Sequence, residues 1–229
     1  MSNESSTETT VQRSGPLTFA VPKGRLHDDV RALFAERNMP FEFENRKLVT
    51  DDQTGSVRFM LVKNSDLPVY VHHGIAGLGV CGDDVLYESG FDFVRLLTFP
   101  FGGTRMCLAA RRDHDPSRDR GRLTVATKFT RFARDFFHNR GIPVEVIKLG
   151  GSVELAPVLG LAPYIVDLVE TGSTLVANDL AVTEELTQIS VHLIANPAYY
   201  KFHYAAVNRL VDTLREERTN HPTSPRSET

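Results

Sequence analysis

Short apolar runs alternate along this chain with stretches of helical spacing. The run at residues 17–21 has the length of a strand, whereas Val30, Leu33 and Phe34 lie on one face of a predicted helix. A stronger helical pattern begins at Phe129, repeats at i+3, i+4, i+7 and i+8, and ends at Gly141. This alternation predicts an α/β fold in which helices cover mixed sheets.

The same patterns divide most of the chain into elements. Further strands are predicted at residues 57–62, 78–81, 91–98, 105–110, 123–126, 143–148, 164–169 and 181–194. Further helices are predicted at residues 68–73 and 83–89, and Ser152 is predicted to cap another. A helical turn is predicted at 175–178. The last predicted helix begins at Pro197 and carries Phe202, Ala206, Leu210 and Leu214 on its apolar face. A charged loop at 111–122 is expected near a lobe boundary. Residues 1–16 and 216–229 are polar and without periodicity, which predicts a disordered tail and a loose C-terminal tail.

Composition narrows the class of protein. The chain has 229 residues, 41 % of them hydrophobic, and a formal net charge of −3, as in ordinary globular proteins, and this mild acidity disfavours a nucleic-acid surface. No apolar run is long enough to span a bilayer, and the N-terminus lacks a secretory pattern, so we expect a cytoplasmic protein. Cys81 and Cys107 lie in apolar runs and are predicted to be buried thiols, and no metal-ligand spacing occurs.

The most informative chemistry follows the apolar run 164–169. One acid, Asp167, interrupts this run, and Glu170, Thr171, Gly172, Ser173 and Thr174 follow it. A strand that leads into a small, hydroxyl-rich loop at a helix start presents free N–H groups to an anion. The two acids would repel a phosphate alone, but they suit a ligand that also carries hydroxyls, such as a ribose 5-phosphate. The alternative is a polar turn that only caps a helix.

The longer sequence around this loop is more specific. GSVELAP, GLA and IVDLVETGSTL, with Asn178 shortly after, resemble the signature of the ATP phosphoribosyltransferase family, which catalyses the first step of histidine biosynthesis. The resemblance covers roughly residues 17–210 and fits the short form of the family. It implies that residues 167–174 hold the 5-phosphate and ribose of phosphoribosyl pyrophosphate. One departure is Pro163, which stands where the family commonly has Asp.

The resemblance also implies a fold and a reaction. We expect two α/β lobes resembling type II periplasmic binding proteins, one formed by residues 17–106 plus 187–215 and the other by 107–186, with substrates between them. The reaction would join N1 of the adenine of ATP to C1 of phosphoribosyl pyrophosphate and release pyrophosphate. Mg²⁺ is the expected cofactor, carried on the pyrophosphate with few protein ligands.

Two basic elements match the family. Lys23, Gly24 and Arg25 in PKGR would bind ATP phosphates, and Arg25 is also a candidate catalytic residue beside Arg46 and Lys47 of NRKLV. These cations would neutralise the leaving group. The alternatives are a solvated basic turn and an exposed charged pair.

A third family element spans residues 68–84, PVYVHHGIAGLGVCGDD. Gly79, Gly82 and Asp84 fit the family pattern, and the two glycines would let a nucleotide approach the backbone, unless they only serve a tight turn. His72 stands where Glu is common and Gly77 where Asp is common, so no catalytic role is assigned to Asp84 or His72. The remaining candidate ATP-binding residues are Arg105, in FGGTRMCLA, and Lys128, in ATKF.

The short form implies partners. Arg46 and Lys47 lie far in sequence from the loop, which favours a homodimer that presents them across a two-fold interface. Long-form members carry a further histidine-binding domain, so the short form implies a separate regulatory subunit resembling histidyl-tRNA synthetase, and no response to histidine by the chain alone. The competing hypothesis is a binding or sensing protein on the same two-lobed fold without catalysis.

Overall fold

A computed structural model describes residues 15–119 and 122–215, and the two predicted tails lie almost entirely outside these residues. The nine strands found in the described residues form one sheet in the order β2-β3-β1-β4-β9-β5-β8-β6-β7. Their bounds are β1 (Leu17–Pro22), β2 (Val49–Asp51), β3 (Val57–Val62), β4 (Leu78–Gly82), β5 (Val94–Arg111), β6 (Leu123–Thr127), β7 (Val144–Lys148), β8 (Tyr164–Val169) and β9 (Leu180–Ala195). The sheet mixes parallel and antiparallel pairs, which confirms the predicted fold class.

Eight α-helices flank the sheet in the described part of the chain. They are α1 (Arg25–Glu36), α2 (Leu67–His72), α3 (Asp83–Ser89), α4 (Thr130–Asn139), α5 (Leu155–Val158), α6 (Ser173–Ala177), α7 (Pro197–Phe202) and α8 (Tyr204–Arg215). None of these helices is long and apolar enough to cross a membrane.

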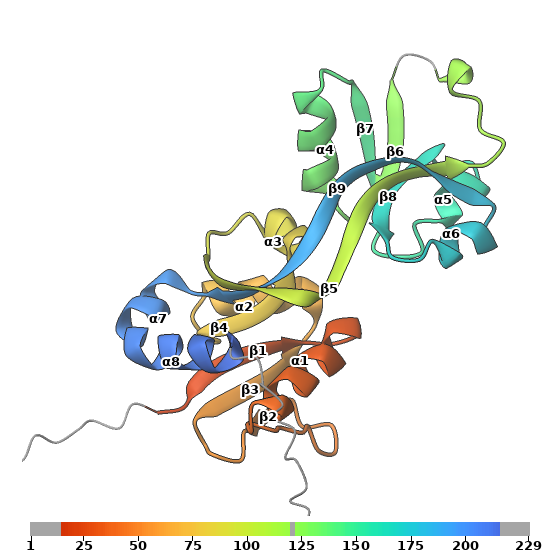
Figure 1. The fold of residues 1–229 in the computed structure, drawn as a ribbon. Helices are drawn as coiled ribbons and strands as arrows, with labels where there is room; N and C mark the ends of the chain where they lie inside the picture. Colours follow the sequence, from red (N-terminus) through yellow and green to blue (C-terminus); the bar gives the residue numbers. More distant parts are fainter. Residues whose placement is uncertain (1–14, 120–121, 216–229) are drawn as a thin grey trace, which may run out of the picture.

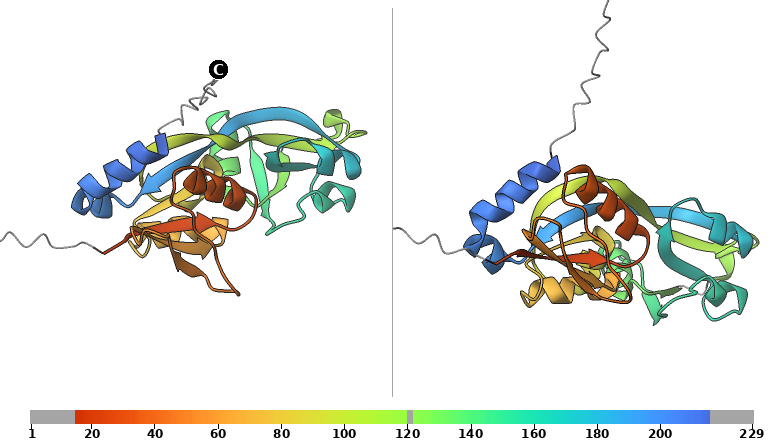
Figure 2. Two further views of the ribbon diagram at one scale, coloured as in Figure 1. Left: turned by 60° about the horizontal axis from the view of Figure 1, so that its bottom comes forward. Right: turned by 90° about the horizontal axis from the view of Figure 1, so that it is seen from below.

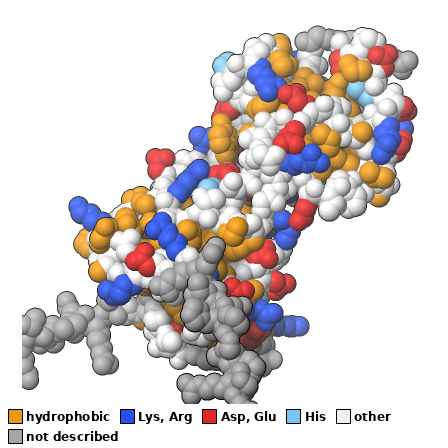
Figure 3. All heavy atoms as spheres, viewed as in Figure 1, with side chains coloured by type: hydrophobic (Ala, Val, Ile, Leu, Met, Phe, Trp, Pro, Cys, Tyr) orange, Lys and Arg blue, Asp and Glu red, His pale blue; other side chains and the backbone are white. Residues whose placement is uncertain are grey.

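Strands β5 and β9 run antiparallel through the whole length of the molecule and join its two ends (Figures 1 and 2). We call the end with β1–β4, α1–α3, α7 and α8 the first lobe, and the end with β6–β8 and α4–α6 the second lobe. The sequence boundaries proposed for the two lobes remain a prediction. On the face shown in Figure 3, acidic and basic side chains are interspersed over both lobes.

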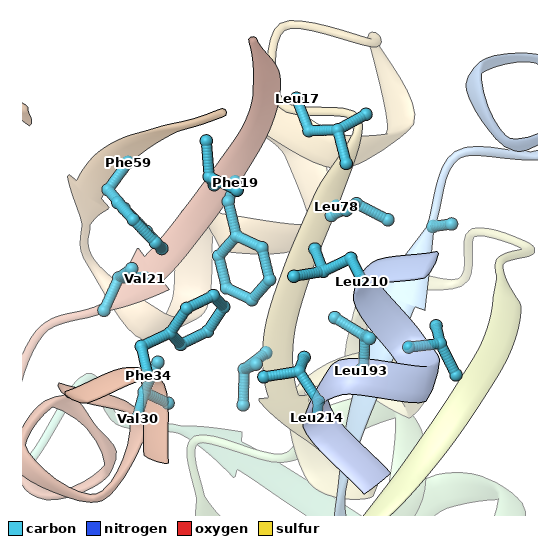
Figure 4. Packing of buried hydrophobic residues seen from close by; sticks show 14 of the residues in the cluster. Leu17, Phe19, Val21, Val30, Phe34, Phe59, Leu78, Leu193, Leu210 and Leu214 are labelled. Carbon is cyan, nitrogen blue, oxygen red and sulfur yellow. The ribbon is translucent and has the colours of Figure 1, made fainter. Parts of the chain in front are cut away.

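The core of the first lobe is rich in aromatic side chains. Phe19 of β1, Phe34 of α1 and Phe59 of β3 are fully buried, and the rings of Phe34 and Phe59 meet edge to face with centroids 4.9 Å apart (Figure 4). Leu210 and Leu214 of α8 pack on the same cluster. Helices α1 and α8 each bury one apolar face in this core. The spacing of apolar residues on that face is therefore what predicts both helices from the sequence.

The second lobe has separate clusters on the two faces of its strands. Cys107, Ala126 and Ile165 pack on one face, and Met106 and Val166 pack on the other. Both cysteines are free and buried, as predicted.

Several predicted elements differ from the structure. The strands expected at 91–98 and 105–110 are one strand, β5, whose register with β9 shifts between Phe99 and Thr104, where Gly102 has a φ of +69°. Ser152 does not cap α5, since Glu154 is the residue before that helix. The predicted turn 175–178 begins earlier, at Ser173.

The predicted C-terminal helix is two helices, because the chain breaks at His203 between α7 and α8. Phe202 is 84 % exposed, so it was wrongly placed on the buried face. That face consists of Val207, Leu210, Val211 and Leu214.

Candidate functional site

The carboxyl ends of the parallel strands carry the polar side chains of the site. In the first lobe β1, β3 and β4 are parallel, and Lys23, Asn64 and Asp84 follow their ends. In the second lobe β6 and β8 are parallel, and Lys128 and Glu170 follow their ends. Open α/β sheets bind ligands at this edge because their loops gather there.

The loop after β8 encloses a cavity of about 240 Å³, which we call the loop cavity. Its lining includes all six predicted phosphoribosyl pyrophosphate residues: Asp167, Glu170, Thr171, Gly172, Ser173 and Thr174. Gly172 has a φ of +80°, in the left-handed region that glycine adopts at least cost, and it directly precedes α6. The Thr171 hydroxyl donates to the Ser173 hydroxyl at 3.1 Å. The structure therefore brings the predicted loop residues together around one space.

Asp167 is the least solvated acid of this cavity. Burial raises the pKa of its carboxyl group, and the ammonium group of Lys128 opposes that rise. Lys128 Nζ lies 3.6 Å from Asp167 Oδ1, which is longer than a hydrogen bond, and this oxygen has no hydrogen-bond partner among the described residues. A ligand hydroxyl would supply the missing donor.

Arg25 connects the two lobes at the same edge. Its Nη1 lies 3.1 Å from Glu170 Oε1, and its Nη2 donates to the carbonyl oxygen of Gly102 at 2.9 Å. Gly24, with a φ of +93°, turns the chain between β1 and α1 so that α1 begins at Arg25. The guanidinium group thus spans from the first lobe to the loop of the second.

A second space, of about 130 Å³, lies beside Arg25, and we call it the central cavity. Its walls carry the apolar side chains Leu26, Leu168, Ile189 and Val191, and its polar lining includes Lys23, Arg25, Asn64, Asp84 and Thr104. Leu168 lines both cavities, so a ligand in each would meet at this residue.

The two glycines proposed for nucleotide binding differ in position. Gly82 lines the central cavity. Gly79 instead packs under α2, since a Cβ atom at this position would lie 2.9 Å from Leu67 and 3.0 Å from Val71. Its lack of a side chain serves the packing of the first lobe, and the space over it is already filled.

Arg46 and Lys47 are not brought to the loop within one chain. They precede β2, at the far end of the first lobe from α6 (Figure 1). Lys47 Nζ lies 3.9 Å from Glu44, and Lys47 lines a shallow hollow with Thr50 and Arg58. Neither residue lines the loop cavity or the central cavity.

Arg105 also lies apart from the two cavities as the described residues define them. It projects from β5, and its Nη1 lies 3.1 Å from Glu185 Oε2 of β9. Its backbone pairs with Val169 of β8, and its side chain lines neither cavity.

The departures from the family pattern have structural partners. A Cβ atom at Gly77 would lie 2.1 Å from the ring of Tyr199, whose hydroxyl accepts from the Thr18 amide at 3.0 Å. The ring of His72 stacks on Phe91 with centroids 4.0 Å apart. Pro163 directly precedes β8, where a missing N–H is tolerated.

Sequence reasoning missed three polar lining residues. Asn64 and Thr104 line the central cavity and Glu154 lines the loop cavity. Asn64 had a usable signal, because it follows the end of a predicted strand. Thr104 and Glu154 lie inside the quoted stretches FGGTRMCLA and GSVELAP, but neither motif by itself shows which of its residues face a cavity.

Comparisons with known proteins agree with this geometry. The HisG family model, ATP phosphoribosyltransferase, matches residues 63–216. The ATP phosphoribosyltransferase of Campylobacter curvus is 40 % identical over 202 residues, covering 88 % of this chain and 97 % of the relative. The ATP phosphoribosyltransferase of Nitratiruptor sp. is 45 % identical over 181 residues, covering 79 % of this chain and 87 % of the relative.

Solved structures are also similar. A chain of the ATP phosphoribosyl transferase (HisG:HisZ) complex from Thermotoga maritima superposes with a TM-score of 0.77 at 33 % identity, covering 87 % of this chain and 96 % of that one. The periplasmic VFT2 domain of Bordetella pertussis BvgS gives a TM-score of 0.56 at 15 % identity over 90 % and 89 % of the two chains, which shows a shared fold alone.

Proposed function

This chain belongs to the ATP phosphoribosyltransferase family, and we propose that the loop cavity and the central cavity together form its active site. The enzyme is a pentosyl transferase of histidine biosynthesis, which joins N1 of the adenine of ATP to C1 of phosphoribosyl pyrophosphate and releases pyrophosphate. The observation that supports the site assignment is Leu168, which lines both cavities and makes the two spaces neighbours.

In this proposal the loop cavity holds phosphoribosyl pyrophosphate. Backbone N–H groups and hydroxyls of residues 171–174 bind the 5-phosphate, and Asp167 and Glu170 accept hydrogen bonds from ribose hydroxyls. A carboxylate beside the ribose also favours the positive charge that develops on the ring as pyrophosphate leaves. Glu170 exchanges its partner Arg25 for the ligand, which frees the guanidinium group for phosphate.

ATP occupies the central cavity, with its adenine between the apolar walls and its phosphates toward Lys23 and Arg25. Positioning N1 directly against C1, beside Leu168 where the two cavities adjoin, supplies most of the catalysis, since the nucleophile needs no base to begin its attack. Arg25 and Lys128 add positive potential on either side of the cavity boundary.

Mg²⁺ fits this site as a companion of the substrate. The described residues contain no cluster of three or more His, Cys, Asp or Glu side chains that would hold a metal ion. The ion would neutralise pyrophosphate charge, and Asp167 and Glu170 of the loop cavity would be carboxylates available to it. The protein's own contribution is to orient the two polyanions.

The proposed catalytic unit is a cytoplasmic homodimer. A two-fold partner would present Arg46 and Lys47 to the loop cavity, as neither reaches it within one chain. The similarity to a chain of a HisG:HisZ complex supports a larger assembly with a regulatory subunit. The alternative of a non-catalytic binding protein rests only on the fold shared with the BvgS domain.

The test is to mix the full chain with ATP, phosphoribosyl pyrophosphate and Mg²⁺ and to follow phosphoribosyl-ATP by absorbance and mass. Product that requires both substrates supports the proposal. Saturable binding of either ligand without product, in the presence of the regulatory subunit, contradicts it.

A further inference from the structure

Asp84 is a buried carboxylate with no role in the site described so far. It lies in the first turn of α3, is 7 % exposed, and lines the central cavity. A Cβ atom at Gly82 would lie 2.3 Å from Asp84 Oδ1, so the carboxylate is placed over a position that only glycine leaves open. This arrangement fixes a carboxylate beside the apolar walls of a cavity whose lining also includes the cations Lys23 and Arg25.

The rest of the cavity suggests what this carboxylate contacts. Leu26, Leu168 and Ile189 line it with apolar side chains, and Asp84 adds a carboxylate acceptor beside them. A 6-aminopurine matches this lining, because its faces are apolar and its amino group can donate to the carboxylate, whereas a 6-oxopurine would present another acceptor to it.

We propose that Asp84 accepts a hydrogen bond from the 6-amino group of adenine and stabilises the positive charge that forms on the ring during transfer. This inference rests on the proposed placement of ATP in the central cavity. In the step, the N1 lone pair forms the bond to C1 while the C1–O bond breaks and its electron pair leaves with pyrophosphate. The adenine ring gains one positive charge, shared between N1 and the 6-amino nitrogen, and no proton has to move.

Lys128 links the two carboxylates of the site. Burial raises the pKa of both Asp84 and Asp167, and the positive charge of Lys128 opposes the rise at each. The negative charge of the neighbouring Asp83 also raises the pKa of Asp84. Lys128 thus favours the ionised form of Asp84, which charge compensation requires.

The experiment compares ATP with the triphosphate of purine riboside, which lacks the 6-amino group. We expect the full-length wild-type enzyme to turn over ATP at least about 100-fold faster than the analogue. Asp84→Asn should lower kcat for ATP at least about tenfold, leave the KM for phosphoribosyl pyrophosphate within about twofold, and reduce the preference for ATP by a similar factor. Part of the preference should remain, because the 6-amino group itself makes N1 more nucleophilic. The matched control is Asp83→Asn, since Asp83 accepts from the Ser190 amide at 3.0 Å and lines a different hollow with Tyr87 and Arg95.

The outcomes separate the inference from the function it rests on. A wild-type enzyme that forms no product contradicts the proposed function. An active wild type whose Asp84→Asn variant keeps its kcat, or keeps the full wild-type preference for ATP, overturns the role of Asp84. If Asp84→Asn fails to fold, Asp84→Glu is measured in its place. This variant keeps a carboxylate, so it must keep the preference for ATP even where turnover falls, and a loss of that preference overturns the role of Asp84.

Discussion

Arg25 and Glu170 are 145 positions apart in the sequence, yet Arg25 Nη1 lies 3.1 Å from Glu170 Oε1. The pair joins the start of α1 to the loop after β8, and so connects the two lobes at the edge where both cavities open. Both side chains are largely exposed, at 43 % and 60 %, so the pair contributes little to stability and is readily exchanged for a ligand.

We first predict the effect of Arg25→Ala. Each lost charge-assisted hydrogen bond to phosphate should weaken binding by about 1.5–3 kcal/mol, roughly 10- to 150-fold, while the free energy of unfolding changes by less than about 1 kcal/mol. Calorimetry with phosphoribosyl pyrophosphate and ATP measures the first effect and urea unfolding the second. Arg31→Ala is the control, because Arg31 lies on the same helix in a comparably exposed pair with Glu42 at 2.8 Å. Equal ligand affinity in both variants would remove Arg25 from the site.

A second prediction concerns the backbone of the loop. Gly172→Ala places a side chain at a φ of +80°, which costs about 1–2 kcal/mol, although the nearest heavy atom, of Val169, is 3.9 Å from the new Cβ. Gly160→Ala gives the same backbone strain at a φ of +75° in the same lobe, with open space around it. Both variants should lose similar stability, but only Gly172→Ala should lose phosphoribosyl pyrophosphate affinity. A parallel loss of affinity in Gly160→Ala would mean that strain alone, and not the loop, controls binding.

The third prediction is a pH dependence of stability. Burial raises the folded-state pKa of Asp167, so the folded protein binds this proton more tightly than the unfolded chain. Its contribution to the free energy of unfolding is fully present below the unfolded pKa and is lost as pH rises through the folded pKa. Asp167→Asn should therefore melt at a higher temperature than wild type at pH 7, and the difference should shrink toward pH 4 in calorimetric scans.

Asp51 provides a control of opposite sign. The hydrogen bond from Arg58 lowers the pKa of Asp51, so its contribution is present at neutral pH and is lost as pH falls. Asp51→Asn should melt no higher than wild type at pH 7. An Asp167→Asn variant that melts lower than wild type at pH 7 would show that the Lys128 interaction outweighs burial.

The fourth prediction tests the shared active site. Arg46→Ala and Gly172→Val should each abolish turnover as homodimers, since each removes one part of every site. When the two variant chains are mixed at random, about half of the dimers contain one chain of each kind. Each mixed dimer has one intact site and one doubly altered site, so about a quarter of wild-type activity should return. Mixtures that stay inactive, in dimers verified by light scattering, would place both parts of the site in one chain.

A fifth prediction concerns Gly77. Gly77→Ala puts a Cβ atom 2.1 Å from the Tyr199 ring, so we expect a loss of about 1–3 kcal/mol in the free energy of unfolding. Tyr199→Leu should relieve most of this loss, which a double-mutant cycle by urea unfolding measures. Additive losses would show that the ring is not what requires glycine.

The sequence by itself determined most of the elements and the chemistry of the loop. Strand β8 and helix α3 were predicted at their observed bounds, because apolar runs and Gly90, at a φ of +68°, are local signals. The loop residues 170–174 were recognised for the same reason, as their hydroxyls and glycine are contiguous in the chain.

Only the tertiary structure decided which distant residues share a space. No local pattern shows that β5 continues through Gly102 into the second lobe, that Tyr199 fills the place beside Gly77, or that Asp84 faces the ligand space and Gly79 the core. Each of these facts depends on packing between segments far apart in sequence, where burial and the exclusion of overlapping atoms select one arrangement. Local propensity does not depend on that packing. For this reason the motifs predict Arg46 and Arg105 in the site, although both lie elsewhere in the single chain.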